Sequence, residues 1–212
     1  MDLLAEIANG VINGDDERIA LLTRELVEQG ASPKTILDDG LISGMNVVGE
    51  RFKAHTIFLP DVLLAAKAMY AGLDLLKPLL IEEGIPPIGR VVIGSVRGDL
   101  HDIGKNLVGI MLKGAGFEII DLGNDVPPES MVESALRKEA SVIGMSALLT
   151  TTMPVMGQVV NMLYQRGLTG RIKTIVGGAP VSAEFAREIG ADAYGFDAAN
   201  AVDRVKSLIN VD

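Results

Sequence analysis

Cysteine and tryptophan are both absent from the 212-residue chain, and aromatic residues make up only 4% of it. Without cysteine the protein can form no disulfide, no thiolate metal site and no protein-ligated iron–sulfur cluster. So few aromatic side chains argue against a surface on which nucleic-acid bases stack. Basic residues are also few, because 19 lysines and arginines stand against 28 acidic residues and give a net charge of −9. That balance disfavours phosphate neutralisation, so we expect no nucleic-acid partner.

Long hydrophobic runs are missing as well. No apolar run approaches the ~18 residues that a membrane-spanning helix needs. The N-terminal MDLLAEIANG has neither the basic start nor the small-residue cleavage site of a secretory signal. Hydrophobic residues nevertheless make up 48% of the chain, enough for one large or two small domains with a sizeable core. The sequence therefore predicts a globular protein with no membrane partner and a cytoplasmic location.

The apolar residues follow a helical period from residue 1 to about residue 81. Four segments each predict a helix: residues 2–9, DDERIALLTRELVEQG, SPKTILDDGLISGMNVVGERF and the stretch after Pro60. In the third of these, Ser32 suits the cap and Pro33 the first helical position. Together they predict a small helical bundle. EEGIPPIGR, residues 82–90, contains two prolines and two glycines and is predicted to be a linker, so we expect domains over 1–85 and 86–212.

From residue 90 onwards, strand-like and helix-like segments alternate, which predicts a parallel sheet covered by helices on both faces. Five strands fit a flavodoxin-like or Rossmann-like doubly wound domain. The expected fold class is thus α/β, with an N-terminal helical bundle and a five-stranded parallel sheet domain. The predicted strands are 90–95, 117–122, 141–146, 172–177 and a weak one at 192–196, and the predicted helices are 103–115, 128–139, 153–167, 181–189 and 198–209.

A glycine-rich turn that contains one of only two histidines follows the first predicted strand. Ligands of such sheets bind beyond the carboxyl ends of the strands. Residues two apart in an extended chain face the same way, so Asp99 can address His101. A carboxylate on one ring nitrogen fixes the tautomer and leaves the other nitrogen free to bind a metal. One such ligand suffices if a macrocycle supplies the others. The alternative is a simple turn in which Asp102 caps the next helix and His101 is solvated.

Three better-known sites do not fit this turn. A phosphate-binding P-loop has four residues between its glycines, but five separate Gly98 from Gly104, and Asn106 stands where a hydroxyl residue belongs. The dinucleotide fingerprint fails because Gly94, Gly98 and Gly104 have the wrong spacing. A zinc site needs three or four ligands, whereas the chain lacks cysteine and its other histidine, His55, lies in the helical half.

Three short motifs resemble the signature of cobalamin-binding proteins. GDLHDIGKNLV carries D-x-H-x-x-G as Asp99, His101 and Gly104, MSALLTTTMP carries S-x-L from Ser146, and IVGGAPVS carries the glycine pair 177–178. In the first half, GLISGMNVVGERFKAHTIFLPDVLLAAKAM looks like the helical cap of methionine synthase's corrinoid module. It also looks like the cap of the stand-alone corrinoid proteins of methylotrophic and acetogenic methyltransferase systems, and these proteins are the closer match. The resemblance covers nearly all of the chain and implies a methyl-carrying corrinoid protein.

The resemblance implies a cobalamin or related corrinoid bound base-off/His-on, with His101 as the lower cobalt ligand. Asp99 would hold the other ring nitrogen, and Ser146 would extend this relay. Glycines would leave room for the nucleotide tail. The residues implied to bind the cofactor in the sheet domain are Gly98, Asp99, Leu100, His101, Asp102, Ile103, Gly104, Ser146, Leu148, Thr150, Gly177, Gly178 and Ala198.

In the cap, Phe52, Leu59 and Val62 are implied to contact the reactive face of the corrin, where an apolar lid would shield it from water. Their alternative role is ordinary bundle core. Two positions depart from the family pattern. Asp38 stands near the place of methionine synthase's cap glutamate and is one methylene shorter, which puts that contact in doubt. His55 stands where relatives often have a small residue and is predicted to be a surface residue, with a place near the upper face of the corrin as the alternative.

The implied function is methyl transport, in which cobalt alternates between Co(I) and methylcobalamin, a Co(III) state. A substrate-specific methyltransferase would load the methyl group, and a second methyltransferase would pass it to tetrahydrofolate or a thiol. A reductive activase is a further implied partner, and the chain itself would be a non-catalytic subunit. The alternatives are the small subunit of an adenosylcobalamin-dependent mutase, a cobalamin-dependent regulatory module and a plain flavodoxin-like receiver. The donor stays open among methanol, methylamines, glycine betaine and aryl methyl ethers.

Overall fold

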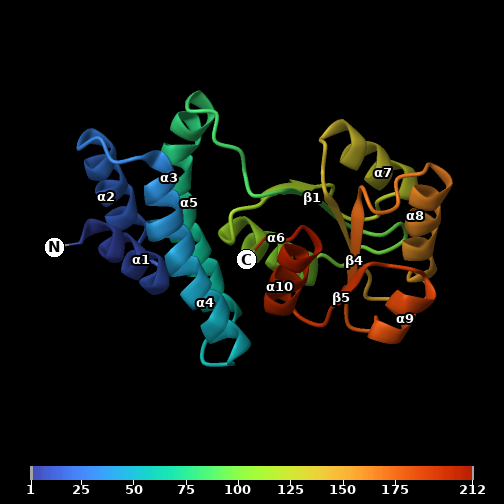
Figure 1. Ribbon diagram of the computed structural model, residues 1–212. Coiled ribbons are helices and arrows are strands. Elements are labelled where there is room, and N and C mark those ends of the chain that lie inside the picture. The colour runs from blue at the N-terminus through green and yellow to red at the C-terminus, as the bar shows by residue number, and fades with distance from the viewer. Residues whose placement is uncertain (1, 212) are drawn as a thin grey trace. The chain divides into compact units, whose positions relative to one another are not determined.

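The computed structural model describes residues 2–211 of the chain (Figure 1). This part divides into two compact units. The helical unit consists chiefly of the segment that ends at Pro87, and the sheet unit chiefly of the segment that begins at Ile88. The sheet unit contains five parallel strands, which confirms the predicted α/β class. Within residues 2–211, no helix combines the length and the apolar character needed to cross a bilayer.

The helical unit begins with a helix that is longer than the sequence predicts. Asp2 caps this helix by accepting a hydrogen bond from the amide of Leu4 at 3.1 Å, and the helix ends at Gly14, whose φ is +71°. Gly10 lies inside this helix, beyond the predicted end at residue 9, and a Cβ there would be only 2.9 Å from Ile19 Cγ1. The elements of this unit are α1 (Leu3–Asn13), α2 (Asp16–Glu28), α3 (Pro33–Thr35), the π-helix η1 (Ile36–Ile42), α4 (Ser43–Lys53) and α5 (Leu59–Glu82).

A π-helical segment interrupts what the sequence predicts as one continuous helix from Pro33. Ile36–Ile42 form this segment, and α4 follows it directly. Two glycines in this region let α1 approach closely, since a Cβ on Gly44 would be 2.6 Å from the carbonyl oxygen of Ala8 and one on Gly40 would be 3.0 Å from Ile7 Cγ2. Hydrophobic spacing does not distinguish a π turn from an α turn over seven residues, so the interruption was not foreseeable.

The sheet unit alternates strand and helix as the sequence predicts. Its strands are all parallel and lie in the order β2-β1-β3-β4-β5, which is the flavodoxin-like order. Each strand lies within one or two residues of its predicted bounds. The elements are β1 (Arg90–Ser95), α6 (Ile103–Gly114), β2 (Glu118–Asp121), α7 (Pro128–Arg137), β3 (Val142–Ser146), α8 (Pro154–Gln165), β4 (Lys173–Gly177), α9 (Ala183–Glu188), β5 (Ala193–Gly195) and α10 (Ala198–Leu208).

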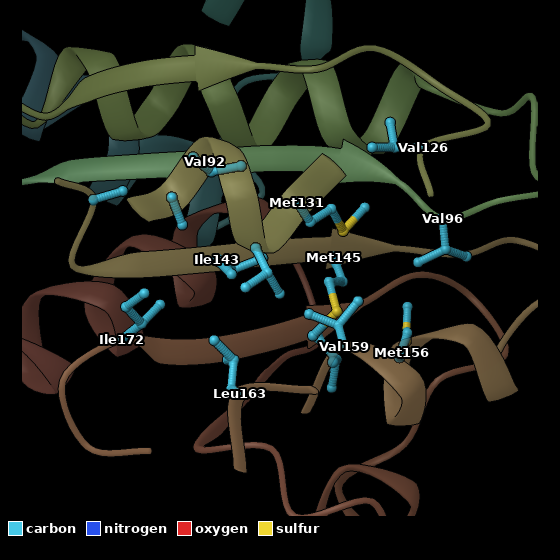
Figure 2. Packing of buried hydrophobic residues seen from close by; sticks show 14 of the residues in the cluster. Val92, Val96, Val126, Met131, Ile143, Met145, Met156, Val159, Leu163 and Ile172 are labelled. Atoms are coloured by element: carbon cyan, nitrogen blue, oxygen red, sulfur yellow. The ribbon is translucent and has the colours of Figure 1, made fainter. Parts of the chain in front are cut away.

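Helices cover both faces of the sheet, with α7 and α8 on one side and α6 and α10 on the other (Figure 1). Figure 2 shows the core under α7 and α8, where Met131, Met145 and Met156 lie together and are all nearly or completely buried. On the opposite face, α6 approaches β1 at Gly109, where a Cβ would be 2.8 Å from Ile93 Cδ1. Burial of each such large side chain contributes about 1.5–3 kcal/mol to the free energy of unfolding. The packed core therefore stabilises the sheet that carries the loops at its carboxyl end.

The order of the strands determines which loops surround the turn after β1. Because β1 lies between β2 and β3, the chain that leaves β1 runs between the loops that follow those two strands. Val96 continues the pairing on both sides, since it forms a bridge with Val126 and its amide donates to the carbonyl oxygen of Ser146 at 3.0 Å. The turn after β1 thus lies at the switch point, where ligands of such sheets bind.

Candidate functional site

Asp99 and His101 form a pair of which one member is buried and the other is accessible. The Asp99 side chain is completely buried, whereas the His101 side chain is 52% exposed. Asp99 Oδ1 lies 2.8 Å from His101 Nδ1 and also accepts a hydrogen bond from the His101 amide at 3.1 Å. With the Nδ1 proton held by the carboxylate, Nε2 keeps its lone pair. Within residues 2–211 no hydrogen bond engages Nε2, so the ring offers one free nitrogen donor.

The second carboxylate oxygen of Asp99 is fully engaged by the turn after β3. Oδ2 accepts from the amide of Leu148 at 2.7 Å, the amide of Leu149 at 3.2 Å and the hydroxyl of Thr152 at 2.8 Å. Burial alone would raise the pKa of Asp99, but these hydrogen bonds and those from His101 outweigh it and hold the pKa well below its usual range. Asp99 is therefore a permanent carboxylate that orients the imidazole.

Thr152 supplies the hydroxyl that donates to Asp99 in the structure, and the relay role implied for Ser146 stays a prediction. Ser146 is the last residue of β3 and contributes its carbonyl oxygen to the pairing with Val96. Six residues later the chain folds back, which brings the Thr152 hydroxyl to Asp99. TTT at 150–152 shows that a hydroxyl is near, but only the shape of the turn decides which one is used. Cofactor binding by Ser146 itself stays a prediction.

The helix after the turn begins at Ile103, and Asp102 precedes it as the sequence predicts. The Asp102 carbonyl oxygen accepts from the amide of Asn106 at 2.7 Å, which is the first helical hydrogen bond. Its side chain, however, makes no hydrogen bond within the described residues. Asp102 therefore takes part in the start of α6 through its backbone alone, and its contact with a cofactor stays a prediction.

Large exposed apolar side chains lie on the two turns that meet at Asp99. Leu100 and Ile103, on either side of the histidine in the chain, are 69% and 74% exposed, and Leu148 and Leu149 on the neighbouring turn are each 42% exposed. Single exposed aliphatic residues are ordinary, but several together mark a contact surface. A broad apolar surface with one nitrogen donor suits a flat ligand that brings its own metal.

The glycines predicted to line a nucleotide slot fall into two physical classes. Gly178 has a φ of +125°, and a Cβ there would overlap the carbonyl oxygen of Ala147, while one on Gly177 would lie 2.9 Å from the carbonyl oxygen of Gly195. These two glycines are required by the protein's own backbone. Gly104 differs, since a Cβ there would meet nothing within 4 Å. Gly104 thus leaves open space beside the histidine turn, as a bound group would require.

The remaining predicted cofactor residues of the sheet unit lie at other strand ends. Gly98 belongs to the histidine turn and has a φ of +85°. Thr150 is exposed on the turn after β3, and Ala198 is buried at the start of α10. Their contact with a cofactor stays a prediction.

The three predicted cap residues belong to the helical unit. Phe52 on α4 and Leu59 at the start of α5 are half-buried. Val62 is completely buried and is in register with Met69 and Leu76 on the buried face of α5, so it has a core role whatever else it contacts. Contact of these residues with a corrin stays a prediction.

Asp38 and His55, which depart from the family pattern, are both accessible. Asp38 lies in η1 and forms an ion pair with Lys34. His55 is exposed directly after α4 and has a φ of +56°. Its predicted place on the surface agrees with this exposure.

Within residues 2–211, no group of three or more His, Asp or Glu side chains is arranged to hold a metal ion. Comparison with known proteins identifies the class of ligand. A B12 binding domain matches residues 89–205, and a second B12 binding domain matches residues 3–77. The chain belongs to the B12-binding corrinoid proteins. His101, the apolar side chains of the two turns and the open space at Gly104 fit such a group.

The similarity to other corrinoid proteins extends over almost the whole chain. Trimethylamine corrinoid protein 1 of Methanosarcina mazei is 40% identical over 210 residues, which are 98% of this chain and 97% of that protein. Dimethylamine corrinoid protein 1 of Methanosarcina acetivorans is 42% identical over 209 residues, or 98% of each chain. A chain in the crystal structure of the methanol:cobalamin methyltransferase complex MtaBC from Methanosarcina barkeri superposes with a TM-score of 0.89 at 32% identity, covering 99% of this chain and 80% of that one. The predicted family and fold are confirmed.

Proposed function

We propose that this protein carries a methyl group on the cobalt of a bound corrinoid, from a substrate-specific methyltransferase to a second methyltransferase that uses tetrahydrofolate or a thiol. The observation that carries the proposal is the single free nitrogen of half-exposed His101, oriented by a buried carboxylate. When bound, the corrinoid supplies a cobalt centre that alternates between Co(I) and Co(III) as it takes up and releases the methyl group.

The protein's own residues would ligate the cobalt, orient the ligating ring and shield the bound group from water. His101 would replace the cofactor's own base as the lower ligand, in the base-off/His-on arrangement. Asp99 holds the Nδ1 proton of His101 and stays ionised because its own pKa is lowered, so Nε2 is kept in the form that binds a metal. The apolar side chains of the two turns would exclude water from this side of the ligand.

The names of the relatives support methylamines or methanol as the methyl source. Two similar proteins are named for trimethylamine and dimethylamine, and a third belongs to a methanol:cobalamin methyltransferase complex. The proposal also includes a reductive activase as a further partner and a cytoplasmic location. The proposed domains span residues 1–85 and 86–212.

The axial role of His101 is tested by loading the protein with cobalamin under anaerobic conditions. His101→Ala should change the absorption spectrum of the bound cofactor, because the lower ligand is lost. His55→Ala is the matched control, since His55 is the other histidine of the chain and is exposed. An unchanged spectrum in the His101 variant would contradict the axial role.

Methyl transfer itself is tested with partner methyltransferases and a panel of donors that includes the methylamines and methanol. Demethylation of the loaded protein by a second methyltransferase supports the carrier role. An adenosyl group on the cofactor isolated with the protein, detected by mass spectrometry, would instead favour the mutase subunit.

A further inference from the structure

The backbone of the histidine turn is tied down from the loop that follows β2, residues 122–127. Asp125 makes two of these ties, since its Oδ1 accepts from the Gly98 amide at 2.7 Å and its own amide donates to the Asp99 carbonyl oxygen at 3.0 Å. Asn124 Nδ2 donates to the Leu100 carbonyl oxygen at 3.3 Å. Three consecutive residues of the turn are thus held by two residues of another loop.

Asp125 makes these contacts from an unusual backbone conformation. Its φ is +53°, in the left-handed region that costs a non-glycine residue free energy and that Asp and Asn tolerate best. Such a conformation persists where the surrounding structure holds it in place. The neighbouring pairing provides this support, since the amide of Ser95 donates to the Gly123 carbonyl oxygen and the amide of Val126 donates to the Ser95 carbonyl oxygen, each at 3.0 Å.

The opposite side of the turn is held at the Asp99 side chain by the turn after β3. The end of the turn is held as well, because the Ser95 hydroxyl donates to the His101 carbonyl oxygen at 2.6 Å. The imidazole therefore projects from a backbone that is fixed on both sides before any ligand arrives. Asp125 binds the turn from the β2 side through both its backbone and its side chain.

We propose that Asp125 is a positioning residue for the axial ligand, and that its contacts to Gly98 and Asp99 hold the His101 ring where it can ligate cobalt. This inference rests on the proposed function and deepens it. A ligand held in its binding geometry beforehand loses less conformational entropy when the bond forms. If one backbone residue of the turn is freed, it must be ordered again when the ligand binds. The entropy lost in that ordering is enough to shift the equilibrium between the ligated and unligated forms by about tenfold.

The test compares Asp125→Ala with Asp125→Asn in the full chain loaded with cobalamin and reduced to Co(II). The nitrogen superhyperfine splitting in the electron paramagnetic resonance spectrum reports the fraction of cobalt that carries the histidine. We expect Asp125→Ala to lower the ratio of His-on to His-off cobalt by about tenfold. Asp125→Asn should stay within about twofold of the original protein, since its oxygen can still accept from Gly98 and asparagine tolerates the same φ.

The control is Glu133→Gln, which removes one carboxylate charge from an exposed ion pair with Arg166 in the same unit and should leave the His-on fraction unchanged. Equal His-on fractions in Asp125→Ala and the original protein would overturn the inference, because a purely structural residue would affect stability alone. An Asp125→Asn variant as defective as Asp125→Ala would also overturn it.

Hydrogen exchange in the cofactor-free protein separates this inference from the proposed function. The Gly98 amide should exchange more slowly in the original protein than in Asp125→Ala, and equal rates would refute the tie itself. Failure of the original protein to bind cobalamin would refute the proposed function while leaving the exchange result to decide whether Asp125 fixes the turn.

Discussion

Asp99 is the residue on which the candidate site depends, since its side chain contacts both His101 and the turn after β3. Its carboxylate is completely buried yet makes hydrogen bonds to four residues. A buried acceptor with all its partners in place stabilises a unique local structure, whereas loss of one partner leaves an uncompensated cost. Substitutions here should therefore change stability as well as ligand binding.

The lowered pKa of Asp99 predicts an acid-dependent loss of stability. Because the pKa of this carboxyl in the folded protein lies below its ordinary value of 3.8, the unfolded state takes up the proton first as the pH falls. The free energy of unfolding contributed by Asp99 is present above the unfolded pKa and is lost as the pH falls towards the folded pKa. The test is to measure the free energy of unfolding by urea at several pH values between about pH 5 and about pH 2.5. In Asp99→Asn this free energy should change less steeply with pH than in the original protein, by an amount that corresponds to the uptake of up to one proton on unfolding. Equal steepness in the two proteins would contradict the pKa shift.

Thr152 and Thr150 provide a matched pair for the relay. Thr152→Val removes a buried hydroxyl that donates to the Asp99 carboxylate and keeps the volume of the side chain. A hydrogen bond to a charged group contributes about 1.5–3 kcal/mol, so chemical denaturation should reveal a loss of that size. Thr150→Val alters an exposed side chain and should change the free energy of unfolding by no more than about 0.5 kcal/mol. A larger effect at Thr150 would mean that the wrong threonine has been assigned.

At the scale of elements, the glycines near the sheet edge divide into those that the fold requires and one that it does not. Gly178→Ala should destabilise the protein severely, since the new methyl group overlaps the Ala147 carbonyl oxygen at a φ of +125°. Gly104→Ala should raise the free energy of unfolding by about 0.5–1 kcal/mol, because alanine favours the helix α6 and the methyl group meets open space. Thermal unfolding of both cofactor-free variants checks this contrast.

Cobalamin binding completes the comparison of the glycines. If Gly104 leaves room for the nucleotide tail, Gly104→Ala should weaken binding by about tenfold or more although the protein is more stable, a loss equivalent to about 1.4 kcal/mol. Unchanged affinity, measured by titration of the cofactor-free protein, would remove Gly104 from the cofactor site.

The order and bounds of the elements were largely predictable from the sequence, whereas the fine structure of the turns was not. Alternating apolar runs predicted every strand, including the weak one that became β5 (Ala193–Gly195). The π segment Ile36–Ile42 escaped prediction because hydrophobic spacing over seven residues does not distinguish a π turn from an α turn. Asp125 escaped prediction because GND reads as an ordinary turn until it is brought against Gly98, a contact distant in the sequence.

The candidate site was also predictable only in part. The Asp99–His101 contact follows from a spacing of two residues in an extended chain, and the structure places the two groups in hydrogen-bonding distance. The contact of the Thr152 hydroxyl with Asp99 depends on how the turn after β3 folds back, which no local pattern specifies. Local geometry was therefore predictable, but the partners supplied by neighbouring strands were not.

For the whole molecule, the segment between the two units is the expected site of proteolytic cleavage. Residues 83–89 contain no regular helix or strand and are largely exposed, and Glu82 ends α5. Exposed segments of this kind are the preferred sites of limited proteolysis. Endoproteinase Glu-C should first cut after Glu82 or Glu83, giving two fragments identifiable by mass spectrometry. A Glu82→Gln, Glu83→Gln double variant should resist this first cut, and early cleavage inside either unit would contradict the proposed domain boundary.

The different accessibility of Asp99 and His101 also restricts the path of protons. Both oxygens of Asp99 are enclosed by donors from the protein, and the exposed edge of the pair is the imidazole. A proton that enters or leaves this pair must therefore pass through the His101 ring. Any molecule that covers that ring therefore also closes this route between the pair and solvent.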